Sequence, residues 1–154
     1  MDKNTAVYVC RGCDIGDSVD LAALGEVAAD EFDIEICREH DCLCAEAGRE
    51  LISADIRDEG VNTIVVGACS PRVMADAFAF DGVQTERVNL REQVVWSHEP
   101  NDEDTQMMAE DYLRMGLARA EKASIPEPVD EPVDGTVLVV GGGVSGMSAA
   151  LDAA

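Results

Sequence analysis

Six cysteines are the residues most able to do chemistry in this chain, because thiols at short spacing bind metals or exchange electrons. Cys10 and Cys13 form a Cys-x-x-Cys pair, a spacing at which two thiolates reach one metal centre. Cys44 and Cys69 each precede an expected helix, whose first backbone N–H groups stabilise sulfur charge. The candidate metal ligands are Cys10, Cys13, Cys44 and Cys69, with Cys37 and Cys42 in reserve.

The residue types alone leave the use of these thiols open. Four thiolates that converge from loops, with backbone N–H groups nearby, suit an iron–sulfur cluster. The same four would also hold zinc in a closed tetrahedral site. Cys10 and Cys13 could instead form a redox dithiol, and free cysteines are often inert buried residues. Arg72 and Arg91 are expected at the surface, with binding of an anionic cluster as the alternative.

The composition limits the settings in which these thiols can act. The 154-residue chain has 32 acidic and 11 basic residues, and its net charge of −21 repels nucleic acid and anionic membranes. No apolar run reaches the roughly 18 to 20 residues of a membrane helix, and the first residues lead into a short strand instead of a signal peptide. We therefore expect a cytoplasmic protein, in which a reducing environment favours metal or redox use of thiols over disulfides.

The thiols need a scaffold that gathers distant segments, and the hydrophobic pattern predicts one. Residues 64–66 are a β-branched run typical of a strand buried on both faces, and the run leads to Cys69. Ser70 and Pro71 then indicate a helix start, through a hydroxyl cap and a proline at the first helical position. Residues 6–9 form a similar strand that leads to Cys10. In parallel α/β sheets, ligands bind at this carboxyl edge.

Strands and helices alternate along residues 1–123. Further strands are expected at 32–37, 85–90 and around 94–96, and helices after residue 18, at 45–59, at 71–80 and at 102–122. This alternation predicts a Rossmann-like α/β fold, a parallel sheet with helices on both faces. All six cysteines are then expected at one edge of the sheet. The residues expected in the core include Trp96, Met107, Met108 and Met115.

Residues 124–135 are rich in proline and carboxylate side chains and predict an extended, semi-stiff linker. Beyond it, residues 136–140 predict a buried strand and residues 147–154 a helix. Because the chain ends there, we expect only the first βα unit of a second domain, unable to bind a dinucleotide by itself.

The loop between this strand and this helix is rich in glycine. Gly141, Gly143 and Gly146 match the dinucleotide-binding fingerprint, in which glycines provide a tight turn, close approach to the pyrophosphate and tight helix packing. Val144 and Ser145 complete the candidate cofactor-binding loop.

Five segments together resemble a known family. They are residues 10–13 (CRGC), 44–52 (CAEAGRELI), 68–72 (ACSPR), 88–92 (VNLRE) and 139–146 (VVGGGVSG). The combination is similar to the amino-terminal part of the A subunit of heterodisulfide reductase and its homologues. These homologues include the related subunit of the quinone-interacting membrane-bound oxidoreductase of sulfate reducers.

The resemblance implies an amino-terminal α/β domain followed by a thioredoxin-reductase-like FAD domain, in a subunit that passes electrons between flavin, iron–sulfur clusters and partner subunits. It implies that a [4Fe–4S] cluster is held by Cys10, Cys13, Cys44 and Cys69. It also implies that the loop at 141–146 faces FAD in the full-length protein.

We therefore expect an electron-transfer module that is not catalytic alone, organised as a cysteine-rich domain (1–123), a linker (124–135) and the start of an FAD domain (136–154). Its expected partners are other subunits of a heterodisulfide reductase-like or quinone-interacting oxidoreductase complex. The alternative is a non-redox docking domain with structural zinc or metal-free thiols. Pairing of two copies through residues 136–140 would give a homodimer.

Overall fold

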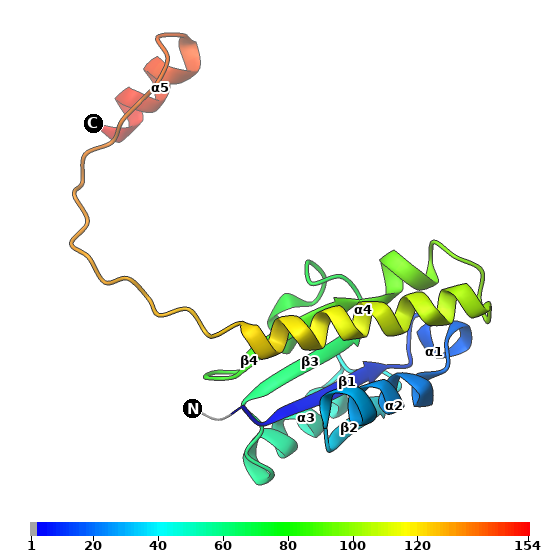
Figure 1. Ribbon diagram of the computed structural model, residues 1–154. Helices are drawn as coiled ribbons and strands as arrows, with labels where there is room; N and C mark the ends of the chain where they lie inside the picture. Colours follow the sequence, from blue (N-terminus) through cyan, green and yellow to red (C-terminus); the bar gives the residue numbers. More distant parts are fainter. Residues whose placement is uncertain (1–2) are drawn as a thin grey trace.

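A computed structural model that describes residues 3–154 places four strands in one parallel sheet, in the order β2-β1-β3-β4 (Figure 1). The strands are β1 (Thr5–Cys10), β2 (Ile36–His40), β3 (Thr63–Ala68) and β4 (Gln84–Asn89). The helices are α1 (Ile15–Ser18), α2 (Leu21–Phe32), α3 (Glu46–Asp58), α4 (Glu103–Lys122) and α5 (Val144–Ala153). Two short turns complete the fold, the 3₁₀ turn η1 (Ala75–Phe78) and the π-helical turn η2 (Arg91–Val95).

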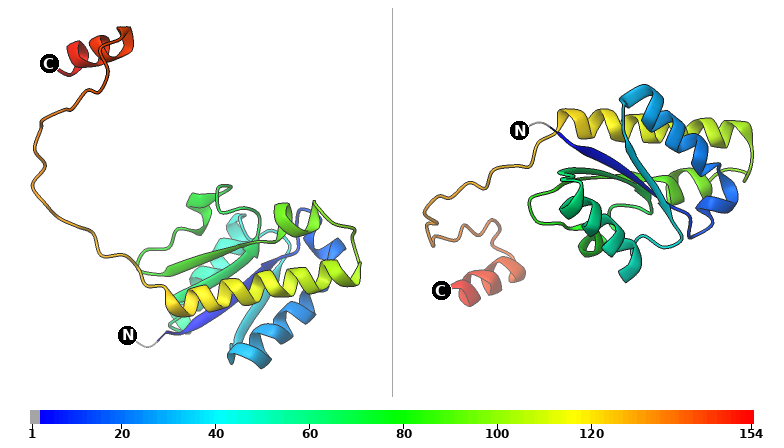
Figure 2. Two further views of the ribbon diagram at one scale, coloured as in Figure 1. Left: turned by 45° about the horizontal axis from the view of Figure 1, so that its top comes forward. Right: turned by 90° about the horizontal axis from the view of Figure 1, so that it is seen from below.

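Helices cover both faces of the sheet. Figure 2 shows α2 and α4 on one side and α3 on the other, so the molecule has three layers. This arrangement confirms the predicted Rossmann-like fold with a parallel sheet. Within residues 3–154, no helix combines the length and the apolar character needed to cross a membrane.

Strand register decides which face each side chain occupies, because neighbours in a parallel sheet point the same way and successive residues alternate. Cys37 pairs with Val7, on the face covered by α2 and α4. Tyr8 pairs with Val66, which in turn pairs with Arg87, on the face covered by α3. The register thereby assigns Cys37 and Arg87 to opposite sides of the sheet.

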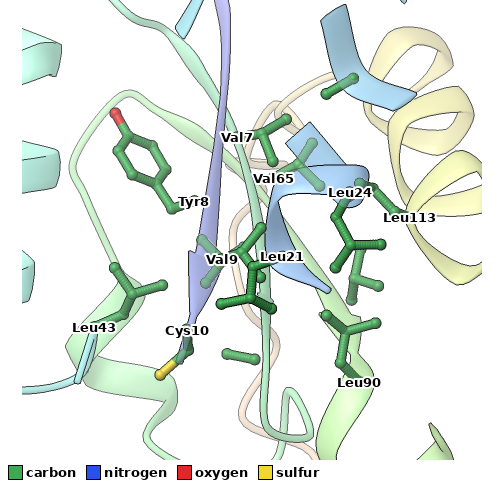
Figure 3. Close-up of a cluster of buried hydrophobic side chains, with 14 of the residues drawn as sticks. Val7, Tyr8, Val9, Cys10, Leu21, Leu24, Leu43, Val65, Leu90 and Leu113 are labelled. Atoms are coloured by element: carbon green, nitrogen blue, oxygen red, sulfur yellow. The ribbon is translucent and has the colours of Figure 1, made fainter. Parts of the chain in front are cut away.

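Apolar side chains fill both inter-layer spaces. Figure 3 shows Val7, Leu24 and Leu113 on one side of β1, and Tyr8 and Leu43 on the other. All five are fully buried. Burial of β1 and β3 on both faces explains why these strands are almost continuously apolar.

Helix α4 packs on the sheet through a stripe of small and branched residues, including Ala109, Leu113 and Gly116. The core predictions for Met107 and Met115 are wrong, since these side chains are 53% and 57% exposed. The helical period explains the error, because residues 109, 113 and 116 define the inward stripe and 107 and 115 fall outside it. Met108 is partly buried against the core, as expected.

The second strand begins later than predicted. Residues up to Phe32 belong to α2, which ends at Asp33 with a positive φ of 53°, and β2 begins at Ile36. The alternation of apolar and acidic residues in this segment led to the predicted strand at 32–37. A helix end at an aspartate, without the usual glycine, hid the boundary.

Residues 71–80 form a turn and η1 instead of the predicted helix. Met74 adopts a left-handed conformation with a φ of 53°, which interrupts any helix there. In addition, the Arg87 guanidinium donates to the carbonyls of Ser70 and Val73, at 3.4 and 3.5 Å. The Ser70 carbonyl also accepts from Val73 N–H at 2.9 Å, which closes a turn at this point.

Residues 94–96 are also not a strand. They lie in and after η2, and Trp96 is 57% exposed, contrary to its predicted place in the core. The Arg91 guanidinium covers its ring at 4.5 Å from the centroid. This cation–π contact accounts for an aromatic side chain that remains at the surface.

The chain leaves the sheet after α4 as an extended arm that ends in α5 (Figure 1). Residues 136–140 are largely exposed and form no strand, so the predicted strand is wrong in this chain. The reason is physical: these residues have no neighbouring strand to pair with.

An ion pair between a half-exposed arginine and a buried carboxylate joins the sheet to α3. Arg38 donates to both carboxylate oxygens of Asp55, at 2.7 and 2.9 Å, and the Tyr8 hydroxyl donates to Asp55 Oδ2 at 3.0 Å. The Arg38 guanidinium is the main cause of the lowered pKa of Asp55, and the tyrosine hydrogen bond contributes. Burial and the Asp55 charge raise the pKa of Tyr8. The carboxylate form of Asp55 therefore stabilises the fold.

We predict that Asp55→Asn lowers the free energy of unfolding by about 1–3 kcal/mol at pH 7, since it weakens a charge-assisted hydrogen-bond network whose arginine is half exposed. Because the folded-state pKa of Asp55 is lowered, its contribution is present above the unfolded-state pKa near ~3.9 and is lost as the pH falls through the folded value. Urea unfolding of both proteins at pH 7 and pH 3 measures this.

The matched control is Asp58→Asn, at an exposed position of the same helix beside Arg57. It should change stability by less than about 0.5 kcal/mol at either pH. A gap between wild type and Asp55→Asn that is as large at pH 3 as at pH 7 would contradict the assignment.

Candidate metal centre

Two thiols lie at the carboxyl ends of adjacent strands. Cys10 is the last residue of β1, and Cys69 follows β3 directly. The two strands are hydrogen-bonded neighbours, so their ends meet at one edge, and both cysteines are buried. Backbone N–H groups of Leu43 and Gly12 donate to the Cys10 sulfur and partly offset the burial that raises its pKa.

The loop between β2 and α3 brings two more thiols to the same edge. Cys42 and Cys44 have their sulfur atoms 3.6 Å apart. The loop is held by hydrogen bonds from Cys42 N–H to His40 Nδ1 at 3.0 Å and from Ala45 N–H to the Cys42 carbonyl at 3.2 Å. Gly48 of α3 packs so closely on this loop that a Cβ there would lie 2.5 Å from the Cys42 carbonyl oxygen.

Cys44 is the centre of the group. Its pKa is raised to about 11, by burial first, then by its hydrogen bond to Cys42, and then by the nearby charges of Cys42, Cys10 and Cys69. Thiols that share a site repel one another once ionised, which opposes ionisation of Cys44. A bound metal reverses this preference, because its positive charge deprotonates the thiols that coordinate it.

Cys13 lies at the exposed rim of the same edge. It has a positive φ of 57°, and its charge acts on the nearby Cys10 thiol. Its sulfur accepts a hydrogen bond from Arg91 Nη1 at 3.4 Å. Five of the six cysteines, all except Cys37, therefore gather at this edge.

The expectation that all six thiols share the edge is wrong for Cys37. It is the second residue of β2 and pairs with Val7, on the opposite face from Cys10. Its sulfur lies under α2, 3.5 Å from the Cβ position of Gly25. The late start of β2 explains the difference, because it puts Cys37 at the beginning of the strand.

An arginine that the sequence pattern did not single out contacts the centre. Arg87 of β4 donates from Nη2 to the Cys69 sulfur at 3.3 Å and to the Cys69 carbonyl at 3.0 Å. Its guanidinium also lies over the Phe78 ring, 4.1 Å from the centroid. One feature of the sequence does distinguish Arg87. It lies in an expected strand of a chain that has only 11 basic residues.

The two arginines that were singled out differ. Arg91 is largely buried, forms an ion pair with Glu92 at 2.6 Å and contacts Cys13, so its expected surface position is wrong. Glu92 in turn accepts a hydrogen bond from Ser70 N–H at 2.8 Å, which links Arg91 to the loop after Cys69. Arg72 is exposed, as expected.

The donors at this edge are of the types that a thiolate-bound group uses, although the side chains would have to move closer together to bind one. They are five thiols, two arginine contacts and backbone N–H groups at one strand edge. Nε of Arg87, the arginine that contacts Cys69 through Nη2, is buried and has no hydrogen-bond partner among the described residues. Within residues 3–154, no three cysteine, histidine or carboxylate side chains are grouped closely enough to hold a metal ion.

Sequence comparison relates the chain to characterised proteins. No protein-family model matches it. It is 35% identical over 156 residues, 96% of its length, to the A subunit of the ferredoxin:CoB-CoM heterodisulfide reductase of Methanosarcina mazei. It is 36% identical over 161 residues to the A subunit of the H(2):CoB-CoM heterodisulfide,ferredoxin reductase of Methanothermobacter marburgensis. A relative in Methanopyrus kandleri, 34% identical over 161 residues, is called an iron-sulfur A subunit of CoB–CoM heterodisulfide reductase.

The chain spans only 20% to 24% of the length of these relatives. The similarity extends over nearly the whole chain, which confirms the resemblance to the amino-terminal part of the heterodisulfide reductase A subunit.

We predict that Gly48→Ala lowers the free energy of unfolding by about 1–3 kcal/mol, because the new Cβ meets backbone atoms of Cys42 and Leu43 at 2.5 Å and must displace the thiol loop. Chemical denaturation of the metal-free protein measures this.

Gly25→Ala is the matched control, since it is also a helical glycine but its Cβ would make only ordinary contact with Cys37. It should raise stability by about 0.5–1 kcal/mol through helix propensity. Equal effects of the two substitutions would contradict the close packing of α3 on the loop.

Proposed function

We infer from this relationship to the heterodisulfide reductase A subunit that the chain is the amino-terminal electron-transfer module of an iron–sulfur and flavin oxidoreductase. The observation that carries the proposal is the gathering of five thiols at one sheet edge, with Cys44 close enough to Cys10 and Cys69 for their charges to interact. A bound [4Fe–4S] cluster would accept and donate single electrons. We assign no substrate chemistry to this fold.

The proposed ligands are Cys10, Cys13, Cys44 and Cys69. Cys10 and Cys69 are fixed by the strand ends, and Cys44 by the loop that α3 supports through Gly48. Backbone N–H groups of Gly12 and Leu43 help to hold negative charge on the Cys10 sulfur.

Cys42 competes with Cys13 for the fourth position, because its sulfur is 3.6 Å from that of Cys44. Cys13 is preferred in the proposal for its place in the Cys-x-x-Cys pair and its contact with Arg91. Substitution of either thiol tests this choice directly.

The glycine-rich loop supports FAD binding in the full-length protein. Gly141 has a φ of 114°, and Gly143 is the residue before the first turn of α5. A Cβ on Gly146 would clash with the Gly141 carbonyl oxygen. These features give a tight turn and a helix start, where a pyrophosphate would bind the first N–H groups of α5, with Val144 and Ser145 in the first turn.

The relatives are subunits of larger reductases, so we propose that other subunits of such a complex receive or supply the electrons. The strongly acidic chain favours basic surfaces on these partners. Residues 3–123 would then act as the relay domain. The linker at 124–135 would connect it to the flavin domain, which begins at residue 136 in the division proposed from the sequence.

The cluster is tested by iron, acid-labile sulfide and zinc analysis of anaerobically purified protein. We predict about four irons and four sulfides per chain, as a [4Fe–4S] cluster requires, and loss of most of both in Cys69→Ser and Cys10→Ser.

Cys37→Ser is the matched control and should keep the wild-type iron content, since Cys37 lies on the opposite face. Cys13→Ser and Cys42→Ser identify the fourth ligand. Stoichiometric zinc, or no metal with all variants equally folded, would overturn the cluster and favour a docking domain.

For the flavin, we predict that Gly146→Ala in the full-length protein strongly reduces FAD content, because the added methyl group collides with the Gly141 carbonyl. Absorbance of the released flavin measures this. Gly142→Ala, where a Cβ meets nothing within 4 Å, should bind FAD as wild type does. Unchanged FAD in Gly146→Ala would count against this loop as the flavin site.

A further inference from the structure

Arg87 carries a positive charge that no carboxylate contacts. Among residues 3–154 it forms no ion pair, although the chain has 32 acidic residues against 11 basic ones. Its Nε is buried without a hydrogen-bond partner. A cation that is partly withdrawn from water is costly to a folded protein, so an anion beside Arg87 would be favoured.

The surroundings of Arg87 show where that anion lies. The guanidinium is held from one side by the carbonyls of Cys69, Ser70 and Val73 and from another by the Phe78 ring. Nη2 also donates to the Cys69 sulfur at 3.3 Å. All four hydrogen-bond contacts involve Nη2, whose two hydrogens are shared among these acceptors, and they keep this nitrogen beside the Cys69 thiol.

Arg91 provides a contrast within the same chain. It also contacts a thiol, Cys13, but its charge is balanced by Glu92 at 2.6 Å. The two arginines lie at the same edge of the sheet. They differ in their partners, because Arg91 is paired directly with Glu92. Within the described chain, Arg87 has no carboxylate at ion-pair distance, although the Glu92 charge also acts on it.

We propose that Arg87 is the counter-charge of the cluster and raises its reduction potential. This inference rests on the proposed function. A bound cluster that took one electron from an external reductant would gain one negative charge, with no bond formed or broken. A nearby fixed cation stabilises the reduced form more than the oxidised form, and burial limits its screening by salt. Arg87 is a positioning residue in this role, since it acts through Cys69.

The test is a redox titration of the reconstituted chain, followed by electron paramagnetic resonance of the reduced cluster. Arg87→Met and Arg87→Gln should lower the ratio of reduced to oxidised cluster at a fixed potential by about tenfold, equivalent to a shift of about 59 mV for one electron. Arg87→Lys, which keeps the charge, should stay close to wild type. Glutamine can still donate to the loop carbonyls, so at least one neutral variant is expected to fold.

Two controls separate charge near the cluster from charge in general. Arg57→Met removes an exposed arginine at the far end of α3 and should leave the ratio unchanged. The double substitution Arg91→Met with Glu92→Gln removes both charges of the ion pair, so it should shift the ratio less than Arg87→Met.

The outcomes distinguish this inference from the proposed function. If the wild-type chain binds a cluster but the neutral Arg87 variants titrate as Arg57→Met does, the counter-charge role is wrong and the cluster stands. If the wild-type chain binds no cluster, both proposals are wrong. A shift in Arg87→Lys as large as in Arg87→Met would assign the effect to hydrogen bonding and would overturn the role of charge.

Discussion

The parallel pairing of β1 with β3 is the constraint on which the rest of the arrangement depends. Because both strands run the same way, their carboxyl ends meet, and the residues that follow them are forced into proximity. Cys10 and Cys69 are almost 60 positions apart in the sequence, yet they need no other device to become neighbours. An antiparallel pairing would have sent the two thiols to opposite edges.

The conformation of the loop after β3 also depends on contacts at this edge of the sheet. The loop after β3 does not continue into a helix, because Met74 is left-handed and Arg87 holds the carbonyls of Ser70 and Val73. This backbone remains in place through contacts with a side chain from the neighbouring strand. Local helix signals at Ser70 and Pro71 were therefore overruled by a tertiary contact, which is the usual way in which weak local preferences are lost.

Much of this could be predicted from the sequence. The β-branched runs of β1 and β3 and the long periodic helix α4 indicated the parallel sheet, and the strand ends indicated the places of Cys10 and Cys69. The place of Cys37 could not be predicted, since it depended on a helix end at Asp33 that carries no glycine signal. The contact of Arg87 with Cys69 could not be predicted either, because it joins separate strands and depends on register. Exposure of Trp96 likewise depends on its stacking with Arg91.

Lys3 fixes the end of α4 at the edge of the sheet where β1 begins. Its ammonium donates to the carbonyls of Ala120, Glu121 and Ala123, and so anchors the last turn of α4 beside the start of β1. Over its 20 residues α4 runs about 30 Å, away from the thiol edge, so the arm departs from the opposite end of the domain. Residues 123–143 can extend roughly 70 Å. Any domain carried by the arm must therefore turn back along the whole helix to meet the thiols, and the length of this tether sets how often the two encounter each other.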